Sequence, residues 1–71
     1  MDTKEVLKEQ FESLSQKIDS DDRAYASIHF KVSQETVNRY IRGLIRKEAF
    51  ALNLLSFLKD RIEEREKALT K

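Results

Sequence analysis

The fold is decided by residues 31–43, which read KVSQETVNRYIRG in a chain of 71 residues. Ser33 belongs to the residue types that cap the N-termini of helices. Gly43 is the only glycine in the sequence, and glycine accepts the left-handed conformation that closes many helices. Between these two signals, Val37 and Tyr40 fall on one side of a helix. The stretch therefore predicts a short amphipathic helix with one buried side.

The other side of this predicted helix carries side chains of the types that read DNA bases in the major groove. Glutamine and asparagine pair with adenine, arginine pairs with guanine, and glutamate accepts a hydrogen bond from cytosine. The candidate base-reading residues are Gln34, Glu35, Asn38 and Arg39. Residues that flank this helix are placed to contact phosphates. The candidate phosphate contacts are Lys31, Ser33, Arg42, Arg46 and Lys47. The pattern predicts sequence-specific binding of duplex DNA.

The segment before this helix, residues 24–32, fits two different structures. As a helix, it offers Ser27 as the small residue at the crossing of two helices, and predicts a helix-turn-helix over about residues 22–42. As a strand, it alternates apolar and polar residues and predicts a ribbon-helix-helix dimer. In that dimer His29 and Lys31 would point into the groove. The sequence leaves both structures open.

Two stretches resemble a known family of regulators. Residues 32–43, VSQETVNRYIRG, resemble the turn and recognition helix of lambda-repressor-like and Cro-like proteins, and residues 44–62, LIRKEAFALNLLSFLKDRI, are similar to the helix that follows. The resemblance covers about residues 23–62 and implies a compact helical bundle, operator binding and often a two-fold dimer. The chain departs from the family at Lys31, where the turn usually contains glycine. A non-glycine residue there costs about 1 kcal/mol if the left-handed conformation is kept.

The first helix is predicted over residues 3–18, where apolar residues recur at steps of three and four. Asp2 and Glu5 resemble a capping box at its start. Aspartate and serine residues at 19–22 predict a solvated turn and the cap of the next helix.

The last helix is predicted to begin near residues 46–49 and to run to about residue 69. Its apolar stripe lies near heptad spacing and predicts a packing or dimer face, made of Leu55, Leu58 and Ile62. Residues 65–71 are predicted to be a frayed tail.

Composition argues against several other classes of protein. The sequence has no cysteine and one histidine, so it offers no disulfide and no cluster of zinc ligands. It also has no glycine-rich phosphate loop and no nucleophile beside a base, which predicts a protein that is not an enzyme and needs no cofactor or metal. The absence of a long apolar stretch predicts no membrane partner, and the absence of cysteine fits a cytoplasmic location. No small-molecule site is evident.

Charge is unevenly distributed, with a net of −4 over residues 1–22 and +4 over residues 31–47. The positive segment coincides with the predicted DNA-binding helix. We expect one domain over residues 1–71 that folds as an all-α four-helix bundle and contains a helix-turn-helix. We expect it to act as a small transcriptional regulator on duplex DNA, with a homodimer as one form of the protein. The alternatives are the ribbon-helix-helix dimer and a helical module that docks a protein partner on residues 51–62 without binding DNA.

Overall fold

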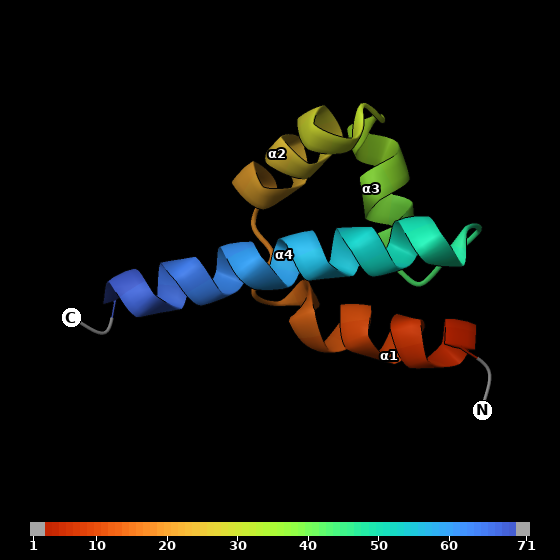
Figure 1. Cartoon of the computed structure of the whole chain (residues 1–71), viewed down its shortest axis with the longest axis horizontal. Coiled ribbons are helices and arrows are strands. Elements are labelled where there is room, and N and C mark those ends of the chain that lie inside the picture. The colour runs from red at the N-terminus through yellow and green to blue at the C-terminus, as the bar shows by residue number, and fades with distance from the viewer. Residues whose placement is uncertain (1–2, 70–71) are drawn as a thin grey trace.

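The computed structural model of the chain describes residues 3–69, which form four helices and no strand (Figure 1). The helices are α1 (Thr3–Ser15), α2 (Ser20–Phe30), α3 (Gln34–Ile41) and α4 (Glu48–Leu69). The predicted all-α four-helix fold is confirmed. The ribbon-helix-helix alternative is wrong, because residues 24–30 are helical and lead into a turn. No helix in residues 3–69 is long and apolar enough to cross a membrane.

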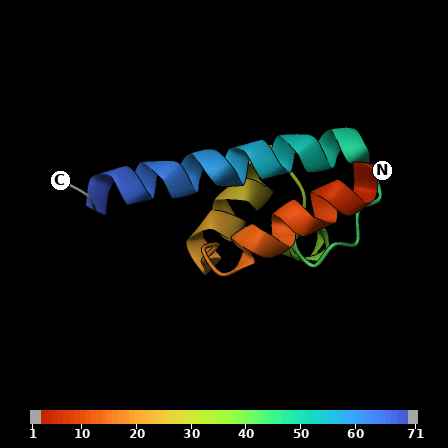
Figure 2. The same ribbon diagram turned by 90° about the horizontal axis from the view of Figure 1, so that it is seen from below.

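The long helix α4 packs across the other three helices, which lie on one side of it (Figure 2). The side of α4 that faces them contributes five residues to the core, Ala51, Leu54, Leu55, Leu58 and Ile62. The stripe predicted as a packing or dimer face is therefore a packing face of the single chain, and it offers no surface to a second copy. Within residues 51–62, which the protein-interaction alternative used as a docking stripe, the core residues are therefore covered by the chain itself, whereas Leu52 is exposed.

Helix α1 ends earlier than the sequence predicted, at Ser15 rather than near Ile18. The backbone N–H groups of Lys17 and Ile18 both donate to the carbonyl of Leu14, at 2.8 and 3.2 Å, so the chain turns before Ile18. Ile18 nevertheless stays in the core. The predicted capping box at Asp2 lies outside the described residues.

Helix α2 begins where the acidic run predicted a cap. The side chain of Asp19 accepts a hydrogen bond from the backbone of Asp22 at 3.0 Å, and Asp22 accepts one from the backbone of Asp19 at 3.2 Å. This reciprocal pair is a capping box built from two aspartates. The run was also predicted to be solvated, and at Asp22 this is wrong, since its side chain is fully buried.

The Asp22 carboxylate ties α2 to α4. It accepts hydrogen bonds from Arg61 at 2.9 Å and from Arg65 at 2.8 Å. Burial by itself raises the pKa of Asp22, but the hydrogen bonds from Arg61 and Arg65 and from the Asp19 backbone outweigh it and hold that pKa below its usual 3.8. The buried charge is therefore compensated by partners that lie far along the sequence.

The C-terminal part of α4 extends past α1 and α2 in Figure 1. Helix α4 continues to Leu69, so residues 65–69 are helical where the sequence predicted fraying. Arg65 anchors this end, because its guanidinium donates to Asp19, to Asp22 and to the carbonyl of Lys17.

Candidate nucleic-acid interface

Helices α2 and α3 are joined by a three-residue turn that closes α2 with a Schellman motif. Lys31 takes the left-handed conformation, with φ 58° and ψ 45°. Its N–H donates to the carbonyl of Ile28 at 3.3 Å, and the N–H of Val32 donates to Ser27 at 3.0 Å. Lysine thus occupies the position at which the family that the sequence resembles usually has glycine. The turn keeps the helix-turn-helix connection that the resemblance implied.

Helix α3 begins and ends at the predicted signals. Ser33 caps it by accepting a hydrogen bond from the backbone of Thr36 at 3.1 Å. A second Schellman motif closes it at Gly43, whose φ is 95°, and the N–H of Leu44 donates to the carbonyl of Arg39 at 2.9 Å. The buried residues of α3 are Val37, Tyr40 and Ile41. The predicted amphipathic helix is therefore confirmed.

The polar side of α3, which we call the α3 surface, consists of Gln34, Glu35, Asn38, Arg39 and Arg42. All of these except Asn38 are exposed. Glu35 and Arg39 form an exposed ion pair at 2.9 Å, one helical turn apart. Asn38 is half-buried, and its Oδ1 atom lacks both solvent and a hydrogen-bond partner. The structure thus brings three predicted base readers together in solvent and leaves the fourth at the edge.

Four of the five predicted phosphate contacts are exposed cations. The side chains of Lys31, Arg42, Arg46 and Lys47 are exposed, and none of them has an ion-pair partner within residues 3–69. The hydroxyl of Ser33, in contrast, is used as the cap of α3. The basic segment of the sequence therefore becomes a group of uncompensated charges around α3.

Hollows border α3 on both sides, and Arg42, Arg46 and Lys47 are among the residues that line them. One hollow is lined by Arg39, Arg46 and Lys47, among other residues. The other side has hollows lined by Arg23 and Arg42, one of which Lys8 also lines. Sequence reasoning did not select Lys8 or Arg23, because neither belongs to the motif. Their position follows from the packing of α1 and α2 against α3.

Tyr40 fixes the connection between α3 and α4. Its ring is in the core and lies 4.9 Å from the ring of Phe50, measured between centroids. Its hydroxyl accepts a hydrogen bond from the backbone N–H of Lys47 at 3.1 Å. Tyr40 was predicted to be a core residue, which is confirmed, and its hydroxyl also holds Lys47 in place beside α3.

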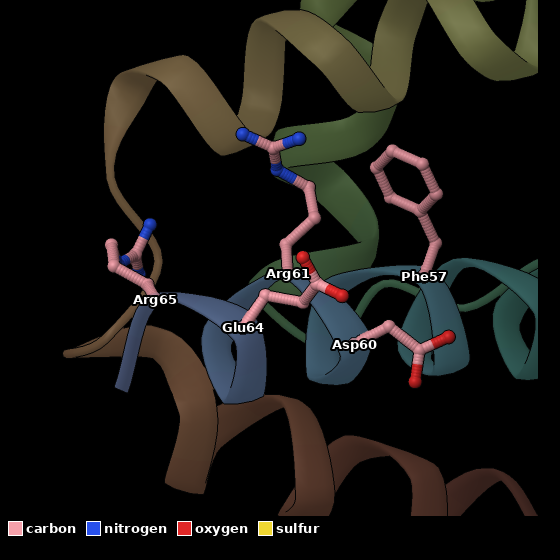
Figure 3. A pocket seen from close by; sticks show the side chains of 5 residues that line it. All are labelled: Phe57, Asp60, Arg61, Glu64 and Arg65. Carbon is pink, nitrogen blue, oxygen red and sulfur yellow. The ribbon is translucent and has the colours of Figure 1, made fainter. Parts of the chain in front are cut away.

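A further hollow of ≈ 440 Å³ lies along the C-terminal half of α4 (Figure 3). Arg61 and Phe57 extend toward α2 in this view, and the carboxylates of Asp60 and Glu64 project from α4. The two arginines that line it already pair with Asp22. This hollow therefore lacks the uncompensated positive charge found around α3.

His29 and the acidic residues do not form a metal site. The His29 ring stacks on Phe57 at 4.7 Å and meets Phe30 edge to face at 4.8 Å. Within residues 3–69, histidine, aspartate and glutamate side chains do not gather in the groups of three that would hold an ion. Among the described residues, the features that suit a ligand are therefore the exposed cations and the hollows around α3.

Comparisons with known proteins add no relative: no family model, no curated protein and no solved structure matches the chain. The resemblance to lambda-repressor-like regulators therefore rests on the residues quoted above. The functional interpretation rests on the geometry and charge of the α3 surface.

Proposed function

We propose that the chain is a small transcriptional regulator that binds duplex DNA with α3 in the major groove. The observation that carries this proposal is the arrangement of charge around α3. Four exposed cations without ion-pair partners in the described chain surround the helix, whereas Arg61 and Arg65 of α4 are paired with carboxylates. Uncompensated cations at the edge of an exposed helix are what contact with phosphates requires.

Base readout is assigned to the exposed residues of α3. Arg39 would exchange its ion pair with Glu35 for the two acceptors of a guanine, and Gln34 would pair with an adenine. Glu35, released from Arg39, can accept from a cytosine. Asn38 remains a proposed base contact from the edge of the surface.

Phosphate contacts are assigned to both sides of the helix. The major groove is about 12 Å wide and is bordered by two phosphate backbones. Arg46 and Lys47 lie on one side of α3, and Arg42 lies on the other, beside Arg23. Lys31 and Ser33 stand at the start of the helix. Cations on both sides suit a helix that is inserted between two backbones.

The experiment is selection of bound duplexes from a random library, followed by measurement of affinity as a function of salt. Lys47→Gln should weaken binding to all sequences alike and lower the magnitude of the salt slope by about 1. Lys59→Gln is the matched control, because Lys59 is an exposed lysine of α4 that hydrogen bonds Gln10 of α1, away from the α3 surface. Equal effects of the two substitutions would refute the assigned interface.

The same selection tests pairing of two copies. A palindromic consensus with half-sites about one helical turn apart would indicate a two-fold dimer on DNA. A single asymmetric site would indicate that one chain binds alone.

A further inference from the structure

The hollow on the Lys47 side of α3, which we call the α3–α4 hollow, combines positive charge with an apolar lining. Three cations line it, Arg39, Arg46 and Lys47, and carboxylates do not. Val32, Tyr40 and Phe50 supply apolar surface. Its volume of ≈ 530 Å³ lies within the range of roughly 300–1,000 Å³ typical of small-molecule sites.

The aromatic part of this lining is already in place. Tyr40 is held by its burial and by the hydrogen bond from the backbone of Lys47. Phe50 packs against Tyr40 at 4.9 Å and against Phe30 at 5.2 Å, measured between ring centroids. A flat apolar ligand would therefore meet a pre-formed surface, which reduces the entropy lost on binding.

Leu44 adds an exposed apolar side chain to the same hollow. Its side chain is 60% exposed, although its backbone is fixed by the hydrogen bond to Arg39. In a Schellman motif, the residue at this position usually packs on an apolar side chain in the last turn of the helix. Here the facing residue is Arg39, whose guanidinium pairs with Glu35. Leu44 is thus left without that apolar partner.

We propose that the α3–α4 hollow binds a small organic anion with a flat apolar body, such as an aromatic carboxylate. The body would lie against Tyr40, Leu44 and Phe50. The carboxylate would pair with Arg46 and Lys47, whose side chains have no ion pair within the described residues. An occupied hollow would compete with DNA phosphates for the same cations, a consequence that rests on the proposed function.

The test is a titration of the nitrogen-15-labelled full chain with phenylacetate, followed by amide chemical shifts. Phenylacetamide keeps the body without the charge, and inorganic phosphate keeps the charge without the body. We expect saturable shifts around Tyr40, Leu44 and Lys47, a dissociation constant on the order of 1 mM or tighter, and binding at least about fivefold tighter than that of the amide. Equal binding of the amide, equal shifts with phosphate, or shifts that do not saturate would overturn the proposal.

Two variants locate the site. Leu44→Ser and Lys47→Gln should each weaken phenylacetate binding by about fivefold or more, with the remaining amide spectrum unchanged. Arg42→Gln is the matched control, since Arg42 is an exposed, unpaired cation at the end of α3 that does not line this hollow. Equal weakening by Arg42→Gln would show general attraction of anions and would refute a specific site.

A separate arm measures DNA affinity in the presence of phenylacetate. We expect saturating ligand to weaken binding to the selected duplex by about fivefold or more. Unchanged DNA affinity with a full hollow would refute the competition. A chain that binds phenylacetate but no duplex would refute the proposed function and leave the ligand site standing.

Discussion

Among the described residues, Lys31 is the one residue other than glycine that has a positive φ. Its φ of 58° is left-handed, which costs a residue with a Cβ atom about 1 kcal/mol or more relative to glycine. We expect Lys31→Gly to raise the free energy of unfolding by about 0.5–1 kcal/mol, net of the greater freedom of glycine in the unfolded chain. Urea unfolding of the two proteins measures this difference, and a lower stability of the variant would contradict it.

Gly43 provides the opposite substitution at the end of the next helix. Its φ is 95°, and a Cβ atom added there would lie 2.6 Å from Cγ of Lys8. We expect Gly43→Ala to lower the free energy of unfolding by about 1 kcal/mol or more, even if the Lys8 side chain moves aside. Thermal unfolding followed by circular dichroism tests this, and an unchanged melting temperature would show that the left-handed turn is not required.

Substitution of Arg39 should change the affinity for DNA much more than the stability of the fold. Its ion pair with Glu35 is exposed on both sides, so Arg39→Ala should change the free energy of unfolding by less than about 0.5 kcal/mol. The same substitution should weaken binding to the selected duplex by about 1–3 kcal/mol and relax specificity at one base position. Competition binding with single-base variants of the duplex measures both effects, and retained specificity would remove Arg39 from the set of base readers.

At the level of elements, the attachment of α2 to α4 depends on one buried carboxylate. Asp22→Ala removes the partner of Arg61 and Arg65 and half of the capping box of α2. We expect a loss of about 2–3 kcal/mol in the free energy of unfolding. Lys17→Ala, which breaks the exposed pair with Glu66, should cost less than about 0.5 kcal/mol. Similar losses in both variants would contradict the special role of Asp22.

The lowered pKa of Asp22 determines how we expect the stability of the fold to respond to acid. The pKa of Asp22 is lower in the folded chain than its usual 3.8, so its contribution is fully present above about pH 5. The contribution is lost as the pH falls from there through the lower pKa of the folded state. Unfolding measured between about pH 2 and pH 6 should therefore show a shallower acid limb for Asp22→Asn than for the unaltered chain. Parallel acid limbs would show that Asp22 does not contribute in this way.

The sequence predicted an element correctly where the residues that determine it lie within or next to that element. Ser33, Gly43 and the apolar spacing between them act within one helix, and α3 forms where they predict it. Residues 24–32 remained ambiguous, because their pattern suits a strand as well as a helix. The structure resolves this through contacts that the pattern does not encode, since Ala26 packs in the core and Lys31 closes the helix.

The candidate site, too, could be predicted only where its signals lie within one helix. Gln34, Glu35 and Arg39 are exposed as a helical pattern requires, whereas Asn38 is half-buried and lines a hollow together with Arg23 of α2. Burial of Asp22 could not be predicted, because its partners lie 39 and 43 residues away. Lys8 and Arg23 were missed for the same reason, since only tertiary packing brings them to α3.

For the whole molecule, the arrangement of apolar residues predicts a single chain in solution. The stripe of Leu55, Leu58 and Ile62 is buried. The exposed large apolar residues in the described chain are scattered over three segments, Tyr25 and Ile28 on α2, Leu44 in the following connection, and Leu52 and Leu69 on α4. A stable dimer typically buries about 800 Å² on each partner. Sedimentation at micromolar concentration should therefore give the monomer mass, and a dimer without DNA would contradict this.

The central claim is that α3 and the cations around it bind duplex DNA. Its most direct test is the affinity for the selected duplex, measured by fluorescence anisotropy between about 50 and 200 mM salt. We predict that the logarithm of the binding constant falls linearly with the logarithm of salt, with a slope of about −4 from Lys31, Arg42, Arg46 and Lys47. If selection yields no duplex that binds, or if the affinity does not change with salt, the account of this protein as a DNA-binding regulator is wrong.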